Sequence, residues 1–223
     1  MKRLILFDID GTLITSPTSS VAVDVIRKRY NIEVSFEGHR IGGMTEPEIL
    51  SLLLQSSGWD ETKIESVLPE LMKDLDDLYA QEFQKGSVRL LPGVTELLDA
   101  LRRPDVVLGL ITGNLKSRAQ RKLEDVDIWL YFSVGGYGDD PHKTRADLVK
   151  TATQRAGFNA DDPGVYVIGD TWRDIKAEVD AGVVNRVGLT SPRHPRKEFE
   201  EAGATIILSS LANTRHVLQA LGI

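Results

Sequence analysis

The chain has 223 residues with 27 basic and 33 acidic side chains, so its formal net charge is −6. This length suits one large domain or a domain carrying an insertion. The absence of cysteine excludes a disulfide framework, a Cys-ligated zinc site and a thiol nucleophile, and it fits a reducing cytoplasm. The acidic balance argues against a nucleic-acid partner, and no apolar run is long enough to span a membrane. We therefore expect a soluble cytoplasmic protein, whose oligomeric state composition leaves open.

Short apolar runs without polar alternation recur along the chain, which is typical of strands buried on both faces of a parallel sheet. The runs are residues 3–7, 106–111, 165–168, 183–187 and 205–208. Segments with helical spacing are residues 94–101, 116–123, 146–156, 175–181, 196–202 and 211–221. Their alternation predicts an α/β fold with a doubly wound parallel sheet and right-handed crossovers.

Residues 15–86 interrupt this alternation with helical patterns and no convincing buried strand. Thr45 and Glu48 form a capping-box signature before one apolar helical pattern. A longer apolar stripe follows from Ile64, and we expect Pro69 to divide it into two helices, because proline suits the first turn of a helix but not its interior.

The sequence thus predicts an α-helical cap domain at residues 15–86, inserted into a core domain made of residues 1–14 and 87–223. The polar segments 14–20 and 84–87 are the expected hinges of this cap.

The first strand runs directly into Asp8-Ile9-Asp10-Gly11-Thr12. Residues two apart at a strand end point the same way, so the carboxylates of Asp8 and Asp10 can converge. Gly11 allows the sharp turn that follows. Ligands of open α/β sheets bind beyond the carboxyl ends of the strands, which is where these acids fall.

A second acidic pair, Asp170 and Asp174, follows another predicted strand. Converging carboxylates repel one another unless a cation joins them, and oxygen ligands of this kind are those that Mg²⁺ prefers. The two acidic pairs therefore predict a magnesium site at this edge of the sheet.

Other strand ends supply groups that suit a phosphate. Thr112 and Gly113 precede a predicted helix, where a hydroxyl and free amides can bind an anion. Lys143 and Arg145 lie before another predicted helix. With Mg²⁺ and one of these cations, the charges of Asp8, Asp170 and Asp174 are balanced, provided that Asp10 is protonated.

These residues resemble the motifs of the haloacid dehalogenase-like hydrolases, and in particular of capped phosphatases similar to phosphoglycolate phosphatase. Asp8 to Leu13 resembles the first motif and Thr112 the second. A basic residue at 143 or 145 resembles the third, and Asp170 with Asp174 the fourth.

The resemblance implies a Rossmann-like core and a phosphatase that acts on a small phosphorylated metabolite. It makes Asp8 the nucleophile of a phosphoaspartyl intermediate and Asp10 the acid and base, a dual role that needs a carboxyl with a raised pKa. Thr112, Gly113 and the basic residue would bind the phosphate. Mg²⁺ would be held by Asp8, Asp10, Asp170 and Asp174, with Asp10 binding through its backbone carbonyl and Asp174 either directly or through water.

Two departures from the family pattern matter for specificity. The third motif commonly reads Lys-Pro; the usual spacing back from Asp170 reaches Lys143, and Arg145 is the alternative. Residues 43–46 read Gly-Met-Thr-Glu where relatives often carry a basic cap residue, which leaves Arg40 as a possible substitute. The basic run at residues 193–197 is interpreted as a solvated loop.

Two alternative functions remain open on the same motifs. One is a sugar phosphomutase similar to β-phosphoglucomutase, against which the Asp-Gly-Thr sequence at Thr12 counts. The other is a phosphoacceptor module of the receiver type, which the inserted residues and Asp10 oppose. Dehalogenation is disfavoured because the dehalogenases of the family lack an aspartate at the position of Asp10.

Overall fold

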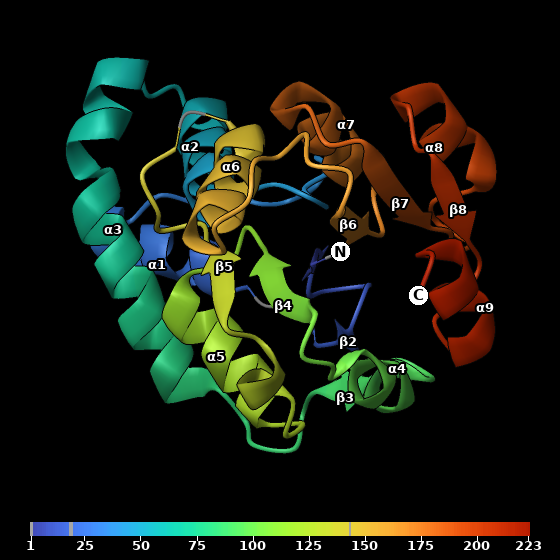
Figure 1. The fold of residues 1–223 in the computed structure, drawn as a ribbon. Helices are drawn as coiled ribbons and strands as arrows, with labels where there is room; N and C mark the ends of the chain where they lie inside the picture. Colours follow the sequence, from blue (N-terminus) through green and yellow to red (C-terminus); the bar gives the residue numbers. More distant parts are fainter. Residues whose placement is uncertain (1, 18–19, 143) are drawn as a thin grey trace.

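The computed structural model describes residues 2–17, 20–142 and 144–223, and its centre is a six-stranded parallel sheet (Figure 1). The strand order is β5-β4-β1-β6-β7-β8. The strands are β1 (Arg3–Phe7), β4 (Val106–Ile111), β5 (Val134–Gly136), β6 (Val165–Gly169), β7 (Asn185–Leu189) and β8 (Ile206–Leu208). This arrangement confirms the predicted doubly wound sheet.

Helices cover both faces of the sheet because its central strands are apolar on both sides (Figure 1). Leu4 and Leu6 of β1 pack in the apolar cluster that includes residues of α6. Ile5 and Phe7 pack in the opposite cluster with residues of α4, α5 and α9. The helices are α4 (Val94–Leu101), α5 (Lys116–Glu124), α6 (Arg145–Arg155), α7 (Trp172–Ala181), α8 (Arg196–Ala202) and α9 (Thr214–Ala220), with a short 3-10 helix at Trp129–Tyr131.

The segment between β1 and β4 contains three helices that pack on one another around their own apolar core. They are α1 (Val21–Tyr30), α2 (Glu46–Ser56) and α3 (Glu61–Glu82). The predicted capping box at Thr45 and Glu48 is present at the start of α2. A two-stranded antiparallel ribbon of β2 (Ile14–Thr15) and β3 (Arg89–Leu90) joins the places where the chain enters and leaves this helical insertion.

The prediction that Pro69 divides two helices is wrong, because α3 continues through it from Glu61 to Glu82. Pro69 is exposed, whereas Ile64, Leu71 and Leu75 are buried in the core of the insertion. A proline inside a helix costs about 3 kcal/mol. The burial of a long apolar face outweighs that cost here.

Two strands differ from their expected positions. The short β5 was not predicted as a strand, because its three residues, two of them glycine, carry almost no hydrophobic pattern. The strand expected at residues 183–187 begins instead at Asn185. The amide of Val183 is still bonded to the carbonyl of Glu178 at the end of α7, so Val183 cannot yet pair with a neighbouring strand.

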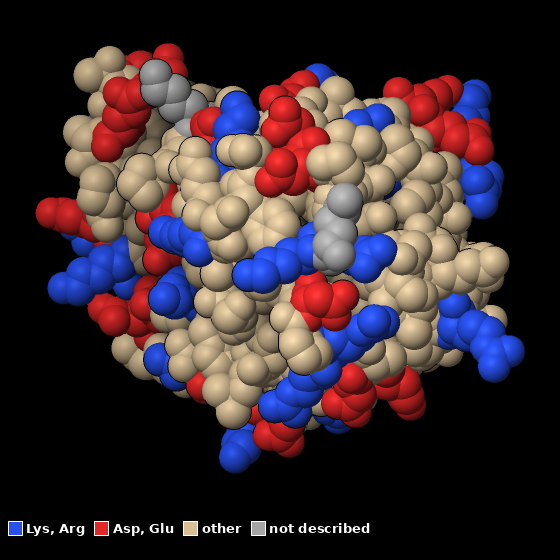
Figure 2. Space-filling view, viewed as in Figure 1, with Lys and Arg blue, Asp and Glu red and all other residues tan. Residues whose placement is uncertain are grey.

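Basic and acidic side chains are interspersed on the face of the molecule seen in Figure 2. Among the described residues, none of the helices is long and apolar enough to cross a membrane.

Candidate active site

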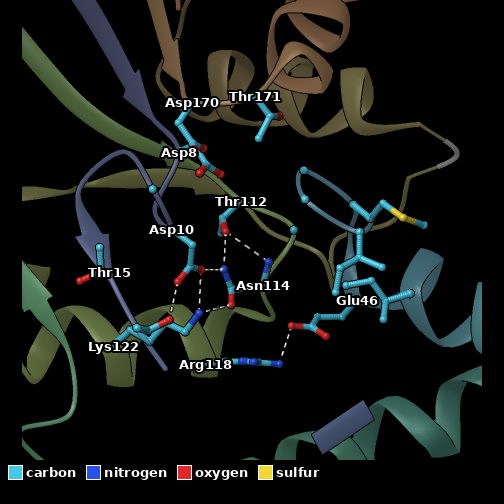
Figure 3. A pocket seen from close by; sticks show the side chains of 18 of the residues that line it. Asp8, Asp10, Thr15, Glu46, Thr112, Asn114, Arg118, Lys122, Asp170 and Thr171 are labelled. Atoms are coloured by element: carbon cyan, nitrogen blue, oxygen red, sulfur yellow. Dashed lines mark hydrogen bonds and ion pairs between the residues drawn. The ribbon is translucent and has the colours of Figure 1, made fainter. Parts of the chain in front are cut away.

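A cavity of about 430 Å³ lies between the carboxyl ends of the central strands and the helical insertion. Most of its polar residues come from the sheet side, and Figure 3 shows Asp8, Asp10, Thr112 and Asp170 facing the same space. The volume is within the range of pockets that bind small molecules. The acidic side chains that the sequence predicts at the strand ends therefore face a cavity of suitable size.

The turn after β1 brings the two acidic strand ends together. Gly11 has a φ of +91°, and a Cβ atom there would lie 2.1 Å from Oδ2 of Asp170. Both the left-handed backbone and the close approach of Asp170 require glycine at this position. This contact places the backbone of the Asp8–Gly11 turn directly against the carboxylate of Asp170.

Asp8 is buried and forms an ion pair with Arg145, whose Nη2 lies 2.9 Å from Oδ1 of Asp8. The same Nη2 lies 2.6 Å from Oδ1 of Asp174. Burial and the nearby charge of Asp174 raise the pKa of Asp8 well above its usual value, although Arg145 acts in the opposite direction. Arg145 is therefore placed to hold the two carboxylates and to bind an anion that approaches Asp8.

The carboxylate of Asp10 is held by three side chains. Its Oδ1 accepts a hydrogen bond from Ser16 at 2.8 Å, and its Oδ2 accepts one from Asn114 at 2.8 Å. The Nζ of Lys122 donates to the same Oδ2 at 2.6 Å. Burial alone would raise the pKa of Asp10, but the charge and hydrogen bond of Lys122, with those of Asn114 and Ser16, lower it to about 2. Asp10 is thus ionised, contrary to the expected raised pKa.

Thr112 is buried beside this network, and its Oγ1 accepts hydrogen bonds from the Nδ2 of Asn114 at 2.7 Å and from the amide of Asn114 at 3.2 Å. With its oxygen engaged as an acceptor, the hydroxyl hydrogen of Thr112 can be donated to a ligand. Gly113 lies against the insertion, since a Cβ there would meet the carbonyl oxygen of Met44 at 2.3 Å.

An ion pair also joins the insertion to the core. The Nη1 of Arg118 on α5 lies 2.5 Å from Oε1 of Glu46 on α2, and both side chains are almost fully buried. The guanidinium lies over the ring of Tyr79 from α3, 4.2 Å from its centroid. The amide of Glu46 also donates to the carbonyl of Gly113 at 3.0 Å. These contacts fix the insertion over the mouth of the cavity.

The structure brings Asp8, Asp10, Thr112, Arg145 and Asp170 to one cavity, as the sequence predicted. The predicted phosphate-binding Gly113 lines the same cavity. Asp174 lies behind them, where its Oδ2 accepts hydrogen bonds from the amide and hydroxyl of Thr171 at the start of α7. Lys143, the other candidate for the third motif, lies outside the described residues.

Sequence reasoning missed Lys122, Arg118 and Glu46, all of which line the cavity. A signal for the two cations was present. Arg118 and Lys122 are four residues apart and directly precede the buried Ala119 and Leu123 on α5, so they share the inward face of that helix.

The basic segment interpreted as a solvated loop contributes Arg193 and His194 to the rim of the cavity. Arg193 is nevertheless exposed, as expected for a surface loop. Arg40, the suggested substitute for a basic cap residue, is not among the described residues that line the cavity. Its Nη2 lies 3.6 Å from Oε1 of Glu198 on α8.

The carboxylates of Asp8 and Asp170 are the best candidates for metal ligands. Burial and the charge of Asp174 raise the pKa of Asp170 to about 7, and the same causes raise that of Asp8. Raised pKa values at both carboxyl groups indicate that the acidic cluster has too little positive charge nearby to balance it. Within the described part of the chain, no three Asp, Glu, His or Cys side chains are grouped to hold a metal ion. The two carboxylates and the adjoining Asp10 carbonyl form a hard-oxygen set that fits Mg²⁺.

The sheet is doubly wound, and carboxylates follow two of its adjacent strands, β1 and β6, at a cavity under inserted helices. This combination defines a class of α/β enzymes. The chain belongs to the haloacid dehalogenase-like hydrolase family, whose model matches residues 5–186. This match confirms the family expected from the sequence motifs.

Three similar proteins extend the comparison. A probable phosphatase, IndB, of Dickeya dadantii is 26% identical over 99% of this chain and 95% of its own length. A phosphoglycolate phosphatase of Shigella boydii is 27% identical over 99% of this chain and 93% of its own. A structure described as a predicted phosphatase from Clostridium acetobutylicum superposes with a TM-score of 0.72 at 19% identity, covering 98% of this chain and 99% of that one.

Proposed function

We propose that this hydrolase is a Mg²⁺-dependent phosphatase that releases phosphate from a small phosphate monoester through a phosphoaspartyl intermediate on Asp8. The main support is the position of Asp8, which directly follows β1 at the cavity with Arg145 in contact and Asp10 two residues away. The phosphatases named among its relatives agree with this proposal.

In the first half of the reaction, a carboxylate oxygen of Asp8 attacks phosphorus, and the bond between phosphorus and the leaving oxygen breaks. The leaving oxygen takes a proton, for which Asp10 is the candidate donor. The hydroxyl of Thr112 and the guanidinium of Arg145 would bind the phosphoryl oxygens, where charge gathers in the transition state. The contact between Arg145 and Asp8 supports Arg145 as the third-motif residue.

In the second half, water attacks phosphorus, Asp10 accepts a proton from that water, and the bond between Asp8 and phosphorus breaks. The ionised Asp10 suits this base step directly, because a carboxylate can accept a proton. The acid step requires Asp10 to gain a proton after the substrate binds. One carboxyl can serve both steps only if its contact with Lys122 changes during the cycle.

Asp8, the backbone carbonyl of Asp10 and Asp170 are the proposed ligands of Mg²⁺, with Asp174 adding negative charge close to them. The ion would supply positive charge that offsets the repulsion between these carboxylates and the phosphate. The charge balance drawn from the sequence assumed that Asp10 is protonated. That assumption is unnecessary, because the positive charge of Lys122 neutralises the Asp10 carboxylate.

The helical insertion is proposed to act as a cap over the reacting atoms. It lies on the core through the contacts of Glu46 with Arg118 and Gly113. A closed cap would exclude bulk water and limit the size of the substrate. The cytoplasmic location expected from the lack of cysteine remains a prediction.

The test is phosphate release from a panel of phosphorylated metabolites and one activated aryl phosphate, with Mg²⁺ and with a chelator. We expect release that needs the metal and is abolished by Asp8→Asn, while circular dichroism shows an unchanged fold. Turnover retained by Asp8→Asn would remove Asp8 as the nucleophile. Isomerisation of a sugar phosphate without net release would favour the mutase, and a stable phosphoprotein without turnover would favour the receiver-type module.

A further inference from the structure

The cavity has two chemically different walls. The charged groups that line it come almost entirely from the core. Besides glycines, Glu46 and residues 15–17 where the chain enters the insertion, the described lining residues that the insertion contributes are apolar: Ala22, Phe36, Ile41, Met44 and Ile49. We call these five residues the apolar roof.

Glu46, the charged residue beside the apolar roof, is already engaged. Its carboxylate pairs with Arg118 at 2.5 Å, and both side chains are about nine-tenths buried. Lys122 pairs with Asp10 at 2.6 Å, and Arg145 pairs with Asp8 and Asp174. Most of the charges that face the roof are therefore paired with one another; the exceptions among the described lining residues are Asp170 and the exposed Arg193 at the rim.

The roof is also held close to the core. A Cβ on Gly43 would lie 2.7 Å from Oγ1 of Thr171, and a Cβ on Gly113 would lie 2.3 Å from the carbonyl oxygen of Met44. The loop that carries Ile41 and Met44 thus touches the core at two places. A leaving group bound below that loop packs against the roof and loses part of its contact with water.

On the basis of the proposed function, we propose that the substrate is a phosphate monoester with an apolar alkyl or aryl leaving group. The phosphate binds at the strand ends, and the organic group packs against the apolar roof. Hydroxyl groups that pack against these five side chains would lose water without gaining a hydrogen-bond partner from them, at a cost of about tenfold or more in affinity for each unpaired group. The assignment therefore predicts that alkyl and aryl phosphates are better substrates than sugar phosphates, whose hydroxyls gain no partner from the roof.

The test is a series of n-alkyl phosphates from methyl to pentyl, because the parent alcohols have similar acidities and the chemical step stays comparable. Burial of each additional methylene should raise kcat/KM about fourfold until the cavity is filled. Propyl phosphate should be a better substrate than glycerol phosphate by about two orders of magnitude, since glycerol adds two hydroxyls. A flat or falling series, or preference for glycerol phosphate or phosphoglycolate, would overturn the assignment.

A matched pair of variants tests the role of the roof. Ile41→Ser should flatten the dependence of kcat/KM on chain length and act mainly through KM. Leu130→Ser is the control, because Leu130 is 90% exposed and does not line the cavity. Equal chain-length dependence in both variants would remove Ile41 from the binding surface.

A binding experiment separates this inference from the proposed reaction. Alkylphosphonates, which cannot lose the alkyl group by hydrolysis, are titrated into the protein with Mg²⁺ and followed by calorimetry. A fourfold gain in affinity per methylene would support an apolar subsite even if none of the esters were hydrolysed. Absence of phosphate release from every ester, the activated aryl phosphate included, would instead refute the proposed function. Phosphonates that bind with no dependence on chain length would refute the inference alone.

Discussion

The contact between Lys122 and Asp10 makes a prediction that does not depend on the substrate. Lys122→Met removes the positive charge and keeps most of the side-chain volume. A hydrogen bond to a charged group contributes about 1.5–3 kcal/mol, and one pKa unit corresponds to about 1.4 kcal/mol. We therefore expect the pKa of Asp10 to rise from about 2 by about one to two units in the variant.

The same shift has a consequence for stability. The pKa of Asp10 is lowered from 3.8 to about 2 in the folded protein, so its ionisation stabilises the fold above pH 3.8 and this contribution is lost as the pH falls through 2. The side chain of Asp10 is 37% exposed, so solvent screening reduces the effect to about 1 kcal/mol at neutral pH. Lys122→Met should lower the free energy of unfolding by about that amount.

The assay is a titration of the Asp10 carboxyl carbon by ¹³C NMR in the metal-free protein, with the resonance assigned by its loss in Asp10→Asn. Arg121→Met is the matched control, because it removes the same charge from an exposed position on the same helix. Lys122→Arg should keep the pKa low. An Asp10 pKa that stays near 2 in Lys122→Met would refute the reasoning, and the low value would then have to come from Asn114 and Ser16.

The other predictions concern the turn, the insertion and a buried acid. Gly11→Ala should displace Asp170, weaken Mg²⁺ binding at least tenfold by calorimetry, and destabilise the fold by about 1–2 kcal/mol; unchanged Mg²⁺ affinity would remove Asp170 as a ligand. In a double-mutant cycle, Arg118→Met and Glu46→Gln should show a coupling of about 1–3 kcal/mol in chemical denaturation, and additive effects would contradict the buried pair. Glu178→Gln should stabilise the protein at pH 8 but not at pH 4: burial and the charge of Asp174 raise the pKa of Glu178, so its ionisation in the unfolded state opposes folding as the pH rises above 4.5. Equal unfolding free energies of wild type and Glu178→Gln at pH 8 would refute that reasoning.

The parts of the site that could be predicted from the sequence are local. Asp8, Asp10 and Gly11 are contiguous with an apolar strand, and the position of a strand end in a parallel sheet fixes the side on which they lie. The same argument placed Thr112 and Asp170 at the ends of β4 and β6. The sequence could therefore predict that Asp8, Thr112 and Asp170 lie close together, because each follows a segment with its own strand pattern.

The predicted helices and strands are wrong at the places where tertiary packing overrides the local preferences of the residues. Pro69 lies inside α3 because its neighbours bury an apolar face against α1 and α2. β5 exists because Gly135 and Gly136 pair with β4, and glycines have no side-chain pattern that reveals a strand. Neither outcome follows from residue preferences alone.

The pairing of Asp10 with Lys122 could not be predicted from local pattern, because the two residues are 112 positions apart. The charge balance drawn from the sequence required a protonated Asp10 because it did not include Lys122, whose positive charge neutralises that carboxylate. Basic residues on the apolar face of a helix are costly to bury without a partner. The spacing of Arg118 and Lys122 with buried Ala119 and Leu123 therefore requires two carboxylates opposite that face of α5, and Glu46 and Asp10 are those carboxylates. The net charge of −6 does not reveal these pairs, because the charges of Arg118 and Glu46 cancel, as do those of Lys122 and Asp10.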